Sequence, residues 1–279
     1  MVETLKNNLF SQNRMDVSVI IPTYNMGRFL PRAVSSVRSQ TQKPLELIIV
    51  DDGNTDDTRE IIDTLSKFTA RSGITLVAIS QLHKSKSAAS NVGISVARGD
   101  AITLLDADDI LPGRSIELRT KYLEEHPGKD AVFTDTNYVD ARGLVYHKRK
   151  PYTDDPRKLT LSFLSAWKAP FHPMSVMYRK RAFDMAGSFD VENSRAEDSD
   201  LAYRMLTRCS VGYLPEPAYT YFTSTHDLKE RMSNRMRCVR DRAKMIKTYS
   251  NGSFKAYLYA ELFLASALKL AHELVTSKR

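Results

Sequence analysis

Short runs of β-branched and other apolar residues alternate with helical patterns through the first hundred residues, and this alternation constrains the fold most. In order, the segments are a strand at 17–21, a helix around 29–37, a strand at 45–50, a helix around 61–65, a strand at 75–79, a helix at 87–97 and a strand at 101–105. Repeated β and α units predict an α/β fold with a mostly parallel sheet that helices cover on both faces. In such sheets ligands bind beyond the carboxyl ends of the strands.

The residues after two of these strands are unusually acidic: 51–57 read DDGNTDD and 106–109 read DADD. The first cluster also suits a turn or a helix cap, and Thr55 or Asp56 can cap the helix that follows. The second is harder to explain in this way, because Asp106 and Asp108 project to one side of an extended chain. A divalent cation would relieve their repulsion and would neutralise the leaving diphosphate of a substrate.

Four ordered segments resemble the inverting glycosyltransferases of family 2, which have the GT-A fold. They are residues 17–25 (VSVIIPTYN), 49–58 (IVDDGNTDDT), 97–109 (ARGDAITLLDADD), and the pair Glu197 and Asp198 ahead of an apolar helix. The resemblance covers roughly residues 17–225 and implies a Rossmann-like, mostly parallel central sheet flanked by helices. It also implies transfer of a hexosyl or N-acetylhexosaminyl group from a nucleotide-sugar to a hydroxyl of a glycan or lipid-linked acceptor, as in polysaccharide biosynthesis.

The resemblance places the donor base at the first two strand ends. Pro22, Thr23 and Tyr24 would form the wall beside the base. Asp52 would accept a hydrogen bond from the imide N–H of uracil, so a UDP-sugar is the expected donor. The alternative for Asp52 is a turn or helix cap.

The resemblance also assigns the acidic cluster after the fourth strand. Asp106 would hold ribose or sugar hydroxyls, and Asp108 would bind Mn²⁺ or Mg²⁺, which in turn binds the diphosphate. Asp109 is expected to support its neighbours. His226 follows the catalytic segment, where related enzymes often carry a histidine near the metal or diphosphate, so it is a candidate metal ligand; the alternative is a solvated or structural imidazole.

The chain departs from the family pattern ahead of the third helix. Residues 83–87 read HKSKS, without the usual glycine turn, and Ser90 precedes Asn91 where the family often has arginine. Lys84 or Lys86 can contact the base or the diphosphate, and Lys86 is the predicted donor-binding residue. The alternative is a solvated lysine in a loop.

The catalytic base must come from a later segment, because it lies on the acceptor side of the sugar. By resemblance it is Asp198, which would take the proton from the acceptor hydroxyl as that oxygen attacks the anomeric carbon. Glu197 would support it or bind the acceptor. The alternative is that Glu197, Asp198 and Asp200 only favour a helix N-terminus through its dipole.

The acceptor is expected to bind between the donor half and the base, where 131–134 and 175–178 look like strands. Trp167 and His172 are candidates there, since the apolar face of a sugar stacks on aromatic rings, although a lone Trp more often lies in a core. The sequence names no acceptor.

The net charge of +8 resides entirely in the last segment. Residues 228–279 hold 12 Lys and Arg against 4 Asp and Glu, which leaves 29 of each in the rest of the chain. The expected organisation is a GT-A domain at 1–227, with a donor half at 16–110 and an acceptor and catalytic half at 111–227, followed by a basic helical tail at 228–279. The tail can dock on the domain, form a homodimer or contact anionic lipid peripherally.

The composition and the charge distribution indicate where the protein resides in the cell and which alternative functions it could have. Only two cysteines and a polar start without a signal-like apolar stretch favour a cytoplasmic protein, either free or peripheral at the inner face of the membrane. The basic tail alone suggests nucleic-acid binding, but the neutral body and the lack of a binding motif argue against that partner. A metal-dependent phosphohydrolase would leave Asp52 and Asp198 without roles. A non-catalytic GT-A relative that binds nucleotide or sugar is the remaining alternative.

Overall fold

The computed structural model describes residues 14–69, 72–140, 142–148, 172–192 and 197–223, with residues 243, 247 and 248. The strands are β1 (Val17–Thr23), β2 (Glu46–Asp51), β3 (Thr75–Ser80), β4 (Ala101–Leu104), β5 (Ala131–Val139), β6 (Val145–Lys148), β7 (Val176–Arg179) and β8 (Val211–Phe222). The helices are α2 (Leu30–Arg38), α3 (Thr58–Thr69), α4 (Lys86–Val96), α5 (Ser115–Glu125), α7 (Lys180–Ala186) and α8 (Glu197–Arg208), with a 3₁₀ turn η2 (Pro173–Ser175).

All eight strands form one sheet in the order β3-β2-β1-β4-β7-β5-β6, and β8 pairs with β5 off this path. β1 to β4 pair in parallel with one another, and β8 is parallel to β5. β7 is antiparallel to both β4 and β5, and β6 is antiparallel to β5. The predicted α/β fold with a mostly parallel sheet is therefore confirmed, and every antiparallel strand comes from the second half of the chain.

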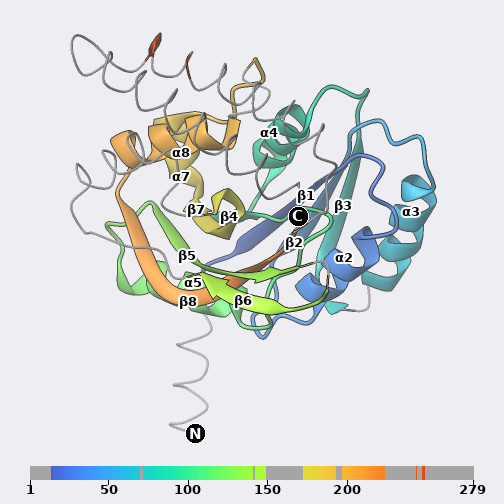
Figure 1. The fold of residues 1–279 in the computed structure, drawn as a ribbon, viewed down its shortest axis with the longest axis horizontal. Helices are drawn as coiled ribbons and strands as arrows, with labels where there is room; N and C mark the ends of the chain where they lie inside the picture. Colours follow the sequence, from blue (N-terminus) through green and yellow to red (C-terminus); the bar gives the residue numbers. More distant parts are fainter. Residues whose placement is uncertain are drawn as a thin grey trace, which may run out of the picture.

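The central strands are apolar on both faces because helices cover both sides of the sheet. Every residue of β1 and β2 is buried. The crossovers from β1 to β2 and from β2 to β3 run in one direction, so the right-handed rule places α2 and α3 on one face, where they contact each other. The chain then returns to β4 on the other side of β1, which places α4 on the opposite face, and Figure 1 shows α4 apart from α2 and α3.

Reversal of the strand order at β1 brings three strand ends together. β1 pairs with both β2 and β4, so the loops after these strands, which carry Tyr24, Asp52 and Asp106, leave the same edge of the sheet. Such a switch point is where open α/β sheets bind ligands. The fold thus positions the predicted donor residues side by side.

β8 is a strand that the sequence pattern did not predict. It runs beside β5 along the edge of the sheet, as the orange and green ribbons of Figure 1 show. Its register shifts opposite Asp135, where Leu214 and then Pro217 pair with consecutive β5 residues. Proline lacks the N–H that a ladder requires, and it is tolerated at such an irregularity. Beyond the shift, β8 carries Tyr219 towards the end of β4, and Thr220 forms an isolated antiparallel bridge with Ile110.

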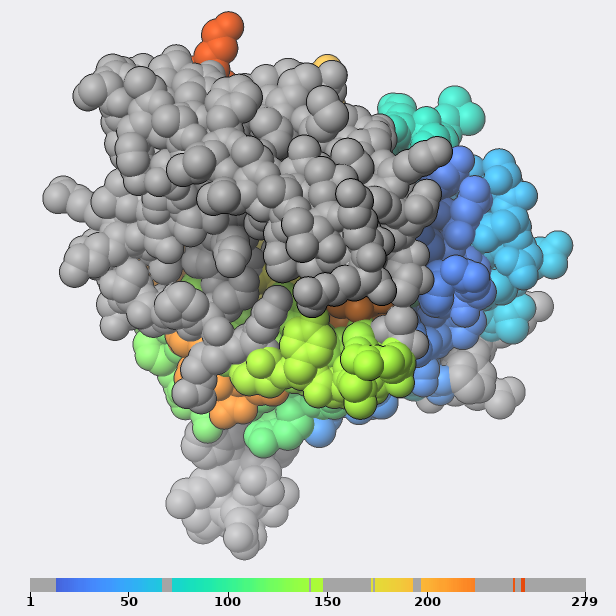
Figure 2. All heavy atoms as spheres, viewed as in Figure 1, coloured from blue at the N-terminus to red at the C-terminus, as the bar shows by residue number. Residues whose placement is uncertain are grey.

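The surface of the described residues includes the turn between β5 and β6. Leu144 and Val145 are 56% and 65% exposed, and Figure 2 shows the yellow-green atoms of residues 142–148 at the molecular surface. Among the residues that the structure describes, no helix combines the length and the apolar character that a bilayer crossing requires.

Candidate functional site

The acidic segment after β4 folds as a turn that gathers three carboxylates. The Asp109 N–H donates to the Asp106 carbonyl over 3.0 Å, which closes the turn. One carboxylate oxygen from each of Asp106, Asp108 and Asp109 lies within 4.8 Å of the others. Asp106 and Asp108 are partly buried and Asp109 is fully buried, so little water screens their repulsion.

Asp109 is held by β8. Its Oδ2 accepts from the Tyr219 hydroxyl at 2.6 Å, and its Oδ1 accepts from the Phe222 N–H at 2.9 Å. Burial, and after it the Asp106 carboxylate, raises the pKa of Asp109 to about 8 despite these two donors. Both carboxylate oxygens of Asp109 are thus held by β8.

Asp106 forms an ion pair with Lys86 at the start of α4. The Nζ–Oδ1 distance is 2.6 Å. Burial lowers the pKa of Lys86, but Asp106 outweighs it with help from Asp198 and Glu197, so the pKa of Lys86 lies above its usual value. The side chain of Ser85 caps α4 by accepting from the Ala88 N–H at 3.2 Å, which orients this first turn towards the acidic segment. Lys86 is therefore a cation in direct contact with the cluster.

Asp108 is the carboxylate best placed for a divalent cation. Burial first and Asp106 second raise its pKa, and the nearby charges of Lys86 and Arg32 offset them only in part. Arg32 from α2 donates to the Asp108 carbonyl oxygen rather than to the carboxylate. Three close carboxylate oxygens are also the ligands that Mg²⁺ and Mn²⁺ favour, so the residues present fit such an ion.

A cavity of about 200 Å³ joins the acidic segment to the start of α8. Its lining consists of Lys86, Ser87, Ser90, Asp106, His172, Met174, Phe189, Glu197, Asp198 and Tyr221. The structure thus brings Asp198, the predicted base, and Glu197, the predicted acceptor-binding residue, into one cavity with Lys86 and Asp106. The two pairs lie about a hundred residues apart in the sequence.

The orientation of α8 is fixed by a buried ion pair between two of its own residues. Arg204 Nη2 lies 2.6 Å from Asp200 Oδ2, and both residues are buried. Arg204 also donates to the carbonyl oxygens of Ala186, the last residue of α7, and of Ser188, two residues later. Asp200 is therefore a structural carboxylate, whereas Asp198 Oδ1 accepts from the adjacent Ser199 N–H at 2.6 Å.

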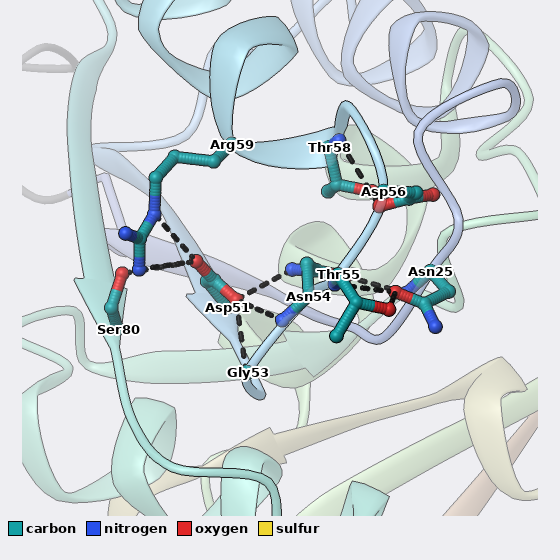
Figure 3. A network of polar contacts seen from close by, with 9 residues as sticks. All are labelled: Asn25, Asp51, Gly53, Asn54, Thr55, Asp56, Thr58, Arg59 and Ser80. Atoms are coloured by element: carbon teal, nitrogen blue, oxygen red, sulfur yellow. Dashed lines mark hydrogen bonds and ion pairs between the residues drawn. The ribbon is translucent and has the colours of Figure 1, made fainter.

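Asp51 and Asp52 are adjacent but take different roles, as Figure 3 illustrates for Asp51. Asp51 Oδ1 accepts from the N–H groups of Gly53 and Asn54 at 3.0 and 2.8 Å, and its Oδ2 accepts from Ser80 and Arg59. The two bonds from Gly53 and Asn54 are typical of an aspartate that begins a turn. Asp56 likewise accepts from the Thr58 N–H at the start of α3, as the capping prediction required.

Asp52 instead faces the segment after β3. It is 2% exposed, and its Oδ1 accepts from Gln81 Nε2 at 2.5 Å and from the Lys84 N–H at 3.1 Å. Its Oδ2 lies 2.9 Å from His83 Nδ1. The capping alternative for Asp52 therefore does not match its contacts.

The predicted wall beside the base is only partly exposed. Pro22 and Thr23 end β1 and are buried, whereas Tyr24 is 41% exposed. The Tyr24 ring stacks on His83 with centroids 3.8 Å apart and an interplanar angle of 20°. Tyr24, His83 and Asp52 thus form a flat aromatic surface beside a buried acceptor.

Several aromatic side chains gather at and beside the cavity. Of these, the sequence analysis identified only His172. His172 stacks on Tyr219 at 5.2 Å and contacts Tyr221 at 4.9 Å, and Tyr138 packs against Tyr221 and Tyr146 at 5.7 and 5.4 Å. Alternation along β5 and β8 would have placed these rings on one face had β8 been recognised. Trp167, His226 and nearly all of the tail at 228–279 lie outside the described residues.

The chain is similar in sequence to known proteins. The chain is 35% identical over 131 residues to the glycosyltransferase GlyG of Streptococcus pneumoniae, covering 47% of this chain and 42% of GlyG. It is 30% identical over 190 residues to chondroitin synthase of Escherichia coli, covering 68% of this chain and 26% of that protein. The chain thus spans less than half the length of these two curated relatives.

Solved structures share the fold at low sequence identity. S. aureus TarS 1–349 in complex with UDP-GlcNAc superposes with a TM-score of 0.64 at 19% identity, covering 89% of this chain and 72% of that one. The mannosyltransferase PcManGT from Pyrobaculum calidifontis, in complex with GDP-Man and Mn²⁺, gives 0.63 at 21% identity, covering 95% and 76%. The model of the family described as "Glycosyl transferase family 2" matches residues 18–186, more than half of the chain. The chain therefore belongs to glycosyl transferase family 2.

Proposed function

We propose that this protein is a metal-dependent inverting glycosyltransferase that moves a hexosyl or N-acetylhexosaminyl group from a nucleotide-sugar to an acceptor hydroxyl. The observation that carries the proposal is the shared cavity, in which Asp106 and Lys86 from the donor half meet Asp198 and Glu197 from the second half. Family membership supports the reaction class.

The donor is proposed to be a UDP-sugar. Tyr24 offers a ring face for the base, and Asp52 is a buried acceptor beside it that suits the imide N–H of uracil. Binding would require His83 to leave either the Tyr24 ring or the Asp52 carboxylate. The TarS complex with UDP-GlcNAc is consistent with this donor class, whereas PcManGT was solved with GDP-Man, so GDP is the comparison nucleotide in any test.

The metal is proposed to be Mn²⁺ or Mg²⁺, held by Asp108 with Asp106 beside it. When bound, the cation would neutralise the developing charge on the leaving diphosphate. Lys86 would add a second positive charge at the same edge through its contact with Asp106. His226 remains a candidate ligand on sequence grounds alone.

Asp198 is proposed to be the general base. The bond between the acceptor oxygen and the anomeric carbon forms as the bond from that carbon to the diphosphate breaks, and the hydroxyl proton passes to the carboxylate of Asp198. A single in-line displacement inverts the anomeric configuration. The Ser199 N–H on Asp198 Oδ1 orients the carboxylate, and Glu197 is proposed to bind the acceptor beside it.

The acceptor is proposed to be carbohydrate, as part of a glycan or a lipid-linked sugar. His172 and Tyr221 line the cavity beside Asp198, and Tyr138 continues the aromatic group outward. Sugar rings stack their apolar faces on such side chains. Trp167 remains a predicted acceptor contact, and the tail at 228–279 remains a predicted membrane-binding or dimer-forming segment.

Titration calorimetry with UDP tests the donor and metal assignment. We expect UDP to bind more tightly in the presence of Mn²⁺ or Mg²⁺ than without, because Asp108 and the diphosphate share the cation. Asp108→Asn should remove most of that metal response, while GDP should bind less tightly than UDP under the same conditions. Equal UDP affinity with and without metal, or an unchanged response in Asp108→Asn, would contradict the assignment.

A further inference from the structure

Among the groups at the end of β8 that contact the acidic turn is one buried hydroxyl, that of Tyr219. We propose that Tyr219 is a positioning residue for the metal site, which sets the geometry of the Asp106–Asp109 turn and so the affinity of Asp108 for a divalent cation. This inference rests on the proposed function, because it deepens the role of the same cluster. Neither the sequence pattern nor the family comparison assigns Tyr219 any role.

The Tyr219 hydroxyl bonds to both ends of the turn. It donates to Asp109 Oδ2 at 2.6 Å and accepts from the Asp106 N–H at 3.3 Å. The Asp109 N–H and the Asp106 carbonyl close the same turn from within. Asp108 is the third residue of this turn, so the position of its carboxylate depends on both closures.

The contact is rigid because of where Tyr219 lies. Its ring is fully buried and stacks on His172, and the next residue, Thr220, bridges to Ile110 directly after the turn through two backbone hydrogen bonds of 3.0 and 3.2 Å. Tyr219 therefore has little freedom to follow the turn. The Asp106–Asp109 turn is therefore held against β8.

The three carboxylates of the turn have different partners. Both oxygens of Asp109 accept hydrogen bonds from β8, one from Tyr219 and one from the Phe222 N–H. Asp106 is engaged by Lys86. Within the part of the chain that the structure describes, no other residue donates a hydrogen bond to the Asp108 carboxylate, while its carbonyl oxygen is fixed by Arg32. The arrangement thus presents Asp108 to a cation and holds its neighbours in place.

The chain contains a matched control for a purely structural role. On the same strand, the Tyr213 hydroxyl donates to Asp135 Oδ1 at 2.8 Å, and Asp135 is fully buried. Tyr213 thus makes the same kind of bond to a buried carboxylate, but Asp135 lies outside the acidic turn. Tyr213→Phe and Tyr219→Phe each remove one hydroxyl and keep the ring.

The test is Mn²⁺ binding to the full chain, followed directly by electron paramagnetic resonance, together with calorimetry of UDP with and without Mn²⁺. We expect Tyr219→Phe to weaken Mn²⁺ binding about 10-fold or more, the range seen when groups that orient metal ligands are removed. Its metal-free UDP affinity should stay at the wild-type value. Tyr213→Phe should bind Mn²⁺ like the wild type, even if it melts at a lower temperature.

The outcomes separate this inference from the proposed function. Equal Mn²⁺ affinity in Tyr219→Phe and Tyr213→Phe, with a metal-binding wild type, would overturn the inference alone. A wild type that binds no Mn²⁺ would overturn the metal assignment and this inference with it. If Tyr219→Phe does not fold, Tyr219→4-fluorophenylalanine replaces it, since the fluorine fills the space of the hydroxyl but cannot donate to Asp109; weakened Mn²⁺ binding would support the inference, and unchanged binding would overturn it.

Discussion

At the scale of single residues, the acidic clusters show what a sequence can and cannot assign. Asp51 and Asp52 follow the same strand, and composition alone leaves both suited to a turn. Adjacent residues leaving a strand point to opposite sides, so only one of them can serve the turn. In the structure, Asp51 accepts the hydrogen bonds of the turn, whereas Asp52 faces His83 and Gln81. The choice depends on where β3 ends beside β2, which no local pattern in the sequence specifies.

Lys86 gives a prediction at this scale. Lys86→Met should weaken UDP-sugar binding about 10- to 100-fold, because a charge-assisted contact is worth about 1.5–3 kcal/mol and each 1.4 kcal/mol is a factor of ten. Ser90 lies one helical turn further along α4 and lines the same cavity. Adding Ser90→Arg to Lys86→Met should therefore restore part of the affinity.

The matched control for this prediction is Lys84→Met. Lys84 is exposed, and its hydrogen bond to Asp52 comes from the backbone N–H, which methionine keeps. Calorimetry with a UDP-sugar would measure all three variants. Equal affinities for Lys84→Met and Lys86→Met would show that Lys86 does not contact the donor.

At the scale of elements, the first half of the sheet could be predicted and β8 could not. β1, β2 and β4 are short apolar runs bounded by polar residues, which is typical of buried parallel strands. β8 contains Pro215 and Pro217, which argue against a strand, and only the register shift opposite Asp135 accommodates Pro217. The aromatic group and the Tyr219 contact were missed for the same reason.

The packing of α4 on β1 gives a prediction at this scale. A Cβ at Gly93 would lie 2.4 Å from Ile20 Cγ2, and Ile20 is fully buried in β1. Gly93→Ala gains about 1 kcal/mol of helix propensity, but overpacking costs about 1–3 kcal/mol, so we expect a net loss of up to about 2 kcal/mol in the free energy of unfolding. Urea denaturation measures it.

Gly128→Ala is the control for this helix contact. A Cβ at Gly128 would meet no atom within 4 Å, so its free energy of unfolding should stay close to that of the wild type. If Gly93→Ala were as stable as Gly128→Ala, α4 would not press on β1 as closely as the structure has it. The position of Lys86 at the start of α4 would then need revision.

At the scale of the whole molecule, one cavity is assembled from two halves of the chain. The donor half supplies Lys86 and Asp106, and the second half supplies Glu197 and Asp198 on α8. The sequence predicted Asp106, Glu197 and Asp198 through short motifs and Lys86 where the chain departs from the family pattern. Their meeting depends on β7 pairing with β4 and on the anchoring of α8 by Arg204. Such long-range contacts leave no local signal. The separation of the chain into a domain at 1–227 and a basic tail stays a prediction.

The central claim is that Asp198 acts as the base within this shared cavity. It is tested most directly by the rate of sugar transfer from a UDP-sugar in Asp198→Asn, with Glu197→Gln as the neighbouring control. An amide matches the shape of the carboxylate but cannot take the proton, so Asp198→Asn should lose at least about 10²–10⁴-fold in rate while its UDP-sugar affinity stays within a few-fold of the wild type. Glu197→Gln should lose less. Transfer by Asp198→Asn at a rate near that of the wild type would contradict the account.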